Sequence, residues 1–181
     1  NDNAPALTLV KQVTNDNGGT VAAAAWTLAA AGPTGFSGPG PSVSNGASFD
    51  AGTYTLSESG PAGYSASAWN CSGGSQNGSQ ITLTLGQSAT CTIGNNDNAP
   101  ALTLVKQVTN NNGGTAVASN WTLSASGPSP FSGAGPSVSN GAGFMAGIYN
   151  LSEGGGPAGY SASAWTCTGG TQNDGDTVTL A

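Results

Sequence analysis

The stretch Leu7-Thr8-Leu9-Val10-Lys11-Gln12-Val13 decides how this chain folds, and it returns almost unchanged as Leu102-Thr103-Leu104-Val105-Lys106-Gln107-Val108. Alternate residues of a β-strand point to opposite faces, so Leu7, Leu9 and Lys11 share one face. Because the neighbours of Lys11 on this face are apolar, the face is predicted to border a core. The stretch therefore predicts a buried strand that carries one cation inward.

Two glutamates are placed in the same manner. Glu58 ends Tyr54-Thr55-Leu56-Ser57-Glu58, and Glu153 ends Tyr149-Asn150-Leu151-Ser152-Glu153, so each shares a strand face with a Tyr and a Leu. The two Glu are 95 positions apart (153 − 58), as are Lys11 and Lys106 (106 − 11). Only 6% of the residues are charged, yet each repeat keeps one Lys and one Glu. The retention of one Lys and one Glu at fixed positions in each repeat indicates that the two side chains act together.

The repeat divides the chain into two domains, predicted at residues 1–95 and 96–181. The second copy opens with Asn96-Asp97-Asn98-Ala99-Pro100, which repeats Asn1-Asp2-Asn3-Ala4-Pro5. Thirty Gly and ten Pro indicate many turns between short strands. We predict an all-β chain of two tandem antiparallel β-sandwiches with about seven strands each, one of them at Val21–Leu28.

Composition excludes several classes of function. A net charge of −6 and the absence of Arg argue against binding of nucleic acid or an anionic membrane surface. No run approaches the ~20 apolar residues of a membrane span. No signal peptide is recognised, and we expect a mature or internal part of a secreted protein. With no His, no activated nucleophile and no phosphate loop, neither a turnover enzyme nor a cofactor is expected.

Two polar segments faintly resemble calcium loops. They are Asn15-Asp16-Asn17-Gly18 and Asn173-Asp174-Gly175-Asp176. The equivalent of the first in copy two, Asn110-Asn111-Asn112-Gly113, has no carboxylate. Solvated turns explain both segments better, and no metal site is predicted.

The cysteines distinguish the two copies. Cys71 and Cys91 lie in the first, whereas Cys167 of the second matches Cys71 and has no partner within the 181 residues. A Cys71–Cys91 disulfide suits a small secreted domain and would contribute ~3 kcal/mol by restricting the unfolded chain. Two buried free thiols are the alternative. The second copy is predicted to lack its last strand, which in the first copy carries Cys91.

The last strand of the first copy adds a third polar group. Asn95 shares its face with Cys91 and Ile93, so a Lys, a Glu and an Asn all project from apolar strand faces. One interpretation is a noncovalent buried Lys11–Glu58 pair. The other is attack of the Lys11 amine on the side-chain amide, with Glu58 shuttling protons, to form an isopeptide bond. Asn96 is an alternative acceptor, although strand alternation favours Asn95.

These residues resemble a known family. A Lys in the first strand, a Glu followed by Pro-x-Gly-Tyr, and an Asn closing the last strand are similar to the collagen-adhesin B-type, SpaA-like or prealbumin-like domains of bacterial surface proteins and pilins. Here the second motif ends in Pro61-Ala62-Gly63-Tyr64 and Pro157-Ala158-Gly159-Tyr160. The family has three residues between Glu and Pro; copy two keeps this spacing and copy one has one fewer. The resemblance implies seven-stranded Ig-like sandwiches outside the cell, with Lys106 and Glu153 as second-copy equivalents of the site.

Two functions follow as hypotheses. The first is a structural repeat module of a bacterial stalk, fibre or filament, and the alternative is an adhesin segment that binds glycan or host protein. We also expect the second copy to be completed by a strand from outside these residues. The donor would be a further repeat of the same polypeptide or a neighbouring copy, through head-to-tail contact or strand donation.

Overall fold

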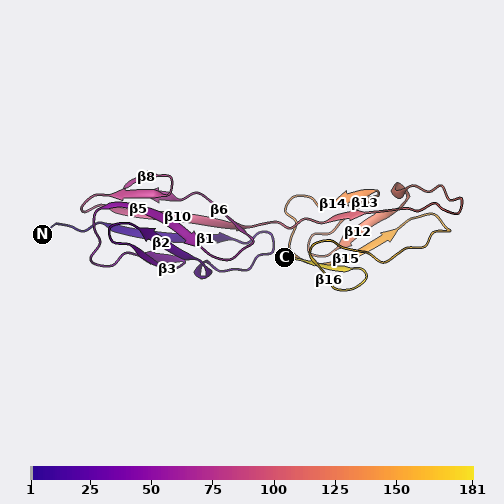
Figure 1. Cartoon of the computed structure of the whole chain (residues 1–181), viewed down its shortest axis with the longest axis horizontal. Helices are drawn as coiled ribbons and strands as arrows, with labels where there is room; N and C mark the ends of the chain where they lie inside the picture. The colour runs from indigo at the N-terminus through magenta and orange to yellow at the C-terminus, as the bar shows by residue number, and fades with distance from the viewer. Residues whose placement is uncertain (1) are drawn as a thin grey trace. The chain divides into compact units, whose positions relative to one another are not determined.

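The computed structural model describes residues 2–181, which divide into two compact units (Figure 1). Unit 1 holds the residues up to Asn15 together with Gly19–Asn98, and unit 2 holds Asp16–Gly18 with Ala99–Ala181. Both are built from short β-strands, and no helix of the described residues is long and apolar enough to cross a membrane. The fold class is therefore all-β, as predicted.

Unit 1 has two sheets. The first has the order β4-β1-β10-β6, with β7 also paired to β10; its strands are β1 (Ala6–Thr14), β4 (Ser42–Ser44), β6 (Tyr64–Ala66), β7 (Asn70–Ser72) and β10 (Ser88–Asp97). The second has the order β3-β2-β5-β9-β8, with β2 (Thr27–Ala31), β3 (Phe36–Pro39), β5 (Gly52–Ser59), β8 (Ser75–Asn77) and β9 (Gln80–Leu83). A single core, with side chains from both sheets, lies between them.

The alternation of β1 and β5 is confirmed. Leu7, Leu9 and Lys11 are buried along β1, whereas the residues between them are only partly covered. On β5 the buried residues are Tyr54 and Leu56, and Glu58 follows on the same face. The apolar residues of each strand thus fix its inner face, and this carries Lys11 and Glu58 toward the interior.

One strand pair departs from the antiparallel arrangement that we predicted. β1 and β10 run parallel over nine residues, from the pair Ala6–Ser88 to the pair Thr14–Asn96. A parallel pair requires a long crossover, and here the crossover consists of the rest of the unit. The first and last strands of the unit therefore lie side by side in one sheet.

The strand predicted at Val21–Leu28 is wrong in its first half. Ala23–Ala25 forms one turn of 3-10 helix (η1), and β2 begins only at Thr27. Ala has high helical propensity and little tendency to form strands, so the run of Ala residues turns before the strand starts. The turn places Trp26 directly before β2, where its side chain is buried.

Unit 2 repeats most of this plan. The pair β11 (Thr103–Val105) and β14 (Ser137–Ser139) corresponds to β1 and β4, and the 3-10 turn η2 (Ala118–Asn120) to η1. A second sheet has the order β13-β12-β15-β17-β16, with β12 (Thr122–Ser126), β13 (Phe131–Ala134), β15 (Gly147–Gly154), β16 (Thr171–Gln172) and β17 (Thr177–Leu180). Among residues 99–181 no strand corresponds to β10, and β11 is three residues long where β1 has nine.

Candidate functional site

Lys11, Glu58 and Asn95 meet inside unit 1. The Nζ atom of Lys11 lies 2.6 Å from Oε2 of Glu58 and also donates a hydrogen bond to Oδ1 of Asn95. Lys11 comes from β1 and Asn95 from the adjacent β10, while Glu58 reaches them from β5 of the opposite sheet. The three residues predicted from strand alternation are thus brought together across both sheets.

The pairing of β1 with β10 positions the Asn side chain. Lys11 lies opposite Ile93, so Asn95, two residues further on, presents its side chain on the same face. Asn95 is 6% exposed, whereas the next residue, Asn96, is exposed to solvent. Of the two candidate acceptors, Asn95 is therefore the one that contacts Lys11.

The site is shielded from water. The side chain of Lys11 is fully covered and that of Glu58 is 12% exposed. The Trp26 ring covers the ammonium group, whose Nζ lies 5.0 Å from the ring centroid, a distance typical of a cation–π contact. Each polar group of the site has a partner, which offsets the cost of placing it among apolar side chains.

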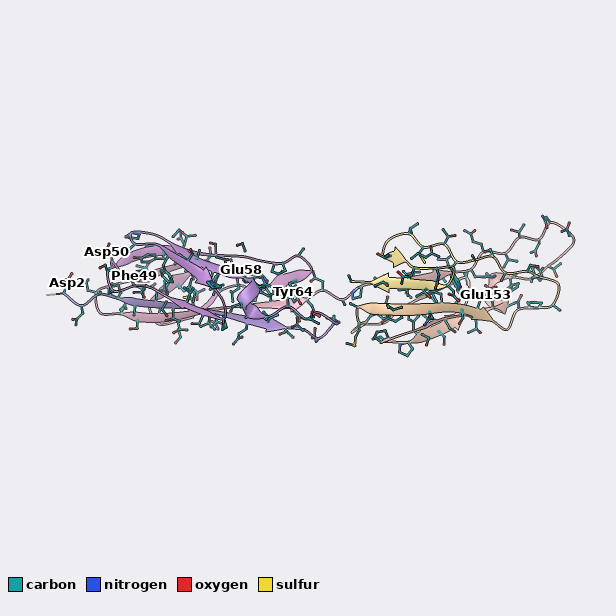
Figure 2. The ribbon with its side chains drawn as sticks, turned by 90° about the horizontal axis from the view of Figure 1, so that it is seen from below. Asp2, Phe49, Asp50, Glu58, Tyr64 and Glu153 are labelled. Atoms are coloured by element: carbon teal, nitrogen blue, oxygen red, sulfur yellow. A yellow bond between two sulfur atoms is a disulfide. The ribbon has the colours of Figure 1, made fainter. Side chains whose placement is uncertain are left out.

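The Pro-x-Gly-Tyr motif builds one wall of the site. The Tyr64 ring packs edge-on against Trp26 at a centroid distance of 5.1 Å. The Tyr64 hydroxyl accepts a hydrogen bond from the backbone N–H of Val21 and donates one to Oδ1 of Asn15. Tyr64 thereby fastens the segment between β1 and η1 and holds Trp26 over Lys11. Figure 2 shows Glu58 between Tyr64, toward one end of the unit, and Phe49 toward the other.

The shorter Glu-to-Pro spacing of the first copy leaves the Glu in place. A Cβ atom on Gly60 would collide with the Trp26 ring, and one on Gly156 would collide with Trp121, so these two glycines occupy equivalent places. The extra residue of the second copy therefore lies in the turn between Glu153 and Gly156. It does not disturb the ion pair, because the Lys–Glu distances in the two units are 2.6 and 2.5 Å.

Unit 2 reproduces the Lys–Glu part of the site. Lys106 pairs with Glu153, and its Nζ lies 4.8 Å from the centroid of the Trp121 ring. The Tyr160 hydroxyl contacts Ala116 and Asn110 as Tyr64 contacts its own loop. The Lys106 side chain is 14% exposed, against 0% for Lys11. The pair therefore forms in unit 2 but is less well covered.

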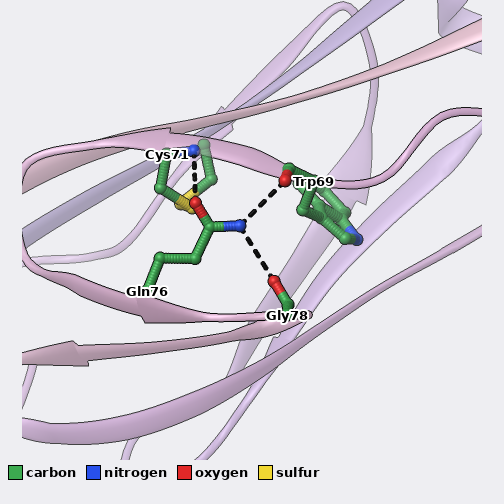
Figure 3. Close-up of a disulfide and its surroundings, with 5 residues drawn as sticks. Trp69, Cys71, Gln76 and Gly78 are labelled. Carbon is green, nitrogen blue, oxygen red and sulfur yellow. Dashed lines mark hydrogen bonds between the residues drawn. A yellow bond between two sulfur atoms is a disulfide. The ribbon is translucent and has the colours of Figure 1, made fainter.

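Cys71 and Cys91 form a disulfide that ties β7 to β10, where they are directly opposite each other. The Gln76 side chain supports this bridge (Figure 3): its Oε1 accepts a hydrogen bond from the Cys71 N–H, and its Nε2 donates to the carbonyls of Trp69 and Gly78. Cys167 is free and half-buried. The disulfide fastens the same strand that supplies Asn95.

Trp26, which covers Lys11, and Gln76, which supports the disulfide, were not singled out from the sequence as site residues. Trp26 belongs to the aromatic residues that recur in both copies, which indicates a core role and gives no sign of contact with Lys11. Gln76 recurs as Gln172, a signal that comparison of the two copies could have found. Their contacts depend on loop conformation, which strand alternation does not describe.

The acidic segment near the C-terminal end is a turn between β16 and β17. The backbone N–H of Asp176 donates a hydrogen bond to Oδ1 of Asp174, which lowers the pKa of the Asp174 carboxyl below its usual value. Within the described residues, no three His, Cys, Asp or Glu side chains form a group that could hold a metal ion. The segment Asp16–Gly18 likewise belongs to no such group.

Comparison with known proteins gives one family. The family described as the prealbumin-like fold domain, of the SpaA type, matches twice, over residues 2–93 and again over residues 97–181. No curated protein and no solved structure matches the chain. The two matches cover nearly all of the sequence.

Proposed function

Because this chain belongs to the SpaA-type family of prealbumin-like fold domains, we propose that it is a structural repeat module of an extracellular bacterial stalk, fibre or filament, stiffened by a Lys11–Asn95 isopeptide bond. The contact of Lys11 with both Glu58 and Asn95 in a covered site carries the proposal. Domains of this family are typically structural, which agrees with a fold of short strands and one disulfide. The module acts on itself once and does not turn over.

The proposed chemistry begins with proton transfer from Nζ of Lys11 to Oε2 of Glu58, across 2.6 Å. Transfer neutralises both groups, and attack requires the neutral amine because its nitrogen then has a free electron pair. The neutral amine then attacks Cγ of Asn95, while the Glu58 carboxyl donates to Oδ1 and stabilises the developing negative charge. The Nζ–Cγ bond forms and the Cγ–Nδ2 bond breaks. Nδ2 leaves as ammonia, with its added proton relayed through Glu58.

Pre-organisation supports this chemistry. Nζ and the amide are held in contact by neighbouring strands whose register is fixed over nine residues, so the reaction is intramolecular. Such positioning removes much of the entropy cost of bringing reactants together. The product would join the first and last strands of the unit, and the Cys71–Cys91 disulfide would hold the same last strand to β7. A pulling force applied at the two ends of the unit would then pass from β1 to β10 through the Lys11–Asn95 bond.

The intact mass of the reduced protein tests the proposal. We expect a mass below the sequence mass by one ammonia, and a peptide in which Lys11 and Asn95 are joined. Glu58→Ala should restore the full mass, because the proton shuttle is lost. Glu153→Ala is the matched control and should keep the deficit, since within the described residues no Asn contacts Lys106. A full mass for the unsubstituted protein, with Lys11 open to acetylation in denaturant, would leave only the noncovalent ion pair.

The adhesin alternative has no observation in its favour. The large apolar side chains that are well exposed among the described residues are Leu85, Val105, Val117, Met145 and Ile148, and none of them is aromatic. A sugar-binding platform would need exposed aromatic rings. The aromatic residues Trp26, Phe49, Tyr54 and Trp69 are instead buried in the core of unit 1.

A further inference from the structure

Unit 2 has a groove along β11. It has a volume of about 430 Å³ and is lined by Leu102, Leu104, Leu151, Trp165, Cys167 and Leu180 among others. A second hollow, of about 300 Å³, is lined by Lys106, Glu153 and Trp165. Leu104, Trp165 and Cys167 belong to the core cluster of the unit or pack against it, so the groove opens onto the core.

The corresponding place in unit 1 is filled by β10. This strand lies between β1 and β7 and buries Ala89, Cys91, Ile93 and Asn95. Leu7 and Leu9 are fully buried, whereas Leu102, the equivalent of Leu7, is only half-buried. The same sequence thus forms a closed core beside β10 and an open groove without it.

Part of the frame that receives β10 is already formed in unit 2. Leu104 pairs with Val138 as Leu9 pairs with Val43, so the strand beside the groove has the same register. On the far side, Gln172 accepts a hydrogen bond from the Cys167 N–H at 3.0 Å and donates one to the Trp165 carbonyl. Gln76 makes the same two bonds to Cys71 and Trp69 in unit 1. These contacts of the two walls therefore match those beside β10, although β11 is shorter than β1 and residues 166–168 form no strand like β7.

We propose that this groove binds an extended peptide strand of the β10 type, with the pattern Ala-x-Cys-x-Ile-x-Asn, running parallel to β11. By the register of unit 1, the Cys of the strand would lie opposite Leu104 and directly beside Cys167. The Ile would lie opposite Lys106, and the Asn oxygen would accept a hydrogen bond from its ammonium group. Main-chain hydrogen bonds to β11 supply affinity, and the alternate side chains supply specificity.

Charge also favours this occupant. The segment Ser88–Asn96 has no charged residue, and the second hollow presents the Lys106–Glu153 pair with its charges balanced. A neutral strand with small and branched side chains can enter without leaving an unpaired charge. A strand with a charged residue in place of the Ile would place that charge against the core.

Because Cys167 is a free thiol beside the groove, docking of the strand can be detected through the disulfide that forms between them. If the Cys of the strand carries a small thiol in a mixed disulfide, the Cys167 thiolate can attack the strand sulfur. The Cys167–strand S–S bond forms, the mixed disulfide breaks, and the small thiol leaves and takes up the proton released from Cys167. Docking should accelerate this exchange, because it places the two sulfur atoms side by side as in the Cys71–Cys91 pair.

The test uses the whole 181-residue protein and a synthetic peptide of residues 88–97 whose Cys is a mixed disulfide with glutathione. We expect a peptide adduct at Cys167, formed at least tenfold faster than with a control peptide carrying Ile93→Lys. In a noncovalent arm, Cys167→Ala protein and a Cys91→Ala peptide should show new amide protection at Thr103 and Val105, because the N–H of Lys106 is already bonded to Pro136 on the β14 side and the N–H groups of alternate residues face the groove. Equal rates for the two peptides, or no protection in the second arm, would overturn the proposal. The isopeptide bond is measured separately, through the intact mass and the peptide that contains Lys11. The proposals of an isopeptide bond and of strand docking can therefore fail independently.

Discussion

At the scale of single residues, the site depends on a stack of three groups. Gly60 packs against Trp26, and Trp26 covers the ammonium group of Lys11. The stack explains why a glycine precedes the Pro of the Pro-x-Gly-Tyr motif in both copies, although the spacing from Glu differs. A side chain at this position would push the indole ring toward the ion pair.

Substitution of Gly60 tests this stack. Gly60→Ala should destabilise unit 1 by about 1–3 kcal/mol, because the added methyl group overpacks a covered aromatic site. Gly46→Ala is the matched control: a Cβ atom there meets nothing within 4 Å, so its effect should stay within about 0.5 kcal/mol. Amide hydrogen exchange of β2 and β5 measures the difference. Equal protection in the two variants would show that the Trp26 ring yields freely.

At the scale of strands, the sequence predicted what alternation controls. The inward faces of β1 and β5 followed from their Leu and Tyr residues, and this placed Lys11 and Glu58 on the core side. It could not predict the parallel pairing of β1 with β10, because alternation is the same for either strand direction. The strand prediction was also wrong at η1, because a run of Ala residues shows no alternation of apolar and polar side chains. The hydrogen bonds of Gln76 depend on a loop that no pattern describes.

The cysteine pairing gives a prediction at this scale. Alkylation in denaturant without reductant should modify only Cys167, because Cys71 and Cys91 are joined. The bridge spans 20 residues of sequence, so replacing both cysteines by Ala should cost unit 1 about 3 kcal/mol in the chain-entropy account. Peptide mapping and urea unfolding are the measurements, and Cys167→Ala serves as the control. Modification of all three thiols would contradict the pairing.

At the scale of the whole molecule, the folding unit is offset from the sequence repeat. The repeat begins again at Asn96, but β10 continues to Asp97, and unit 1 extends to Asn98. Asp97 is 6% exposed, and its Oδ2 accepts a hydrogen bond from the Gly19 N–H at 2.6 Å. The Asn98 N–H donates to the Gly63 carbonyl. The first residues of the second copy therefore complete the fold of unit 1, although the repeat spacing counts them with the second copy.

This offset predicts unequal effects at two equivalent repeat positions. Asp97→Ala should lower the stability of unit 1 by about 1.5–3 kcal/mol, because it removes a charged acceptor from the covered Gly19 N–H. Asp2 occupies the same position in the first repeat but is exposed, so Asp2→Ala should change stability by less than about 0.5 kcal/mol. Hydrogen exchange at Gly19 and across β10 distinguishes local loosening from global unfolding. Similar effects of the two substitutions would mean that the fold ends where the sequence repeat ends, and that Asp97 acts only as part of the connection to Pro100.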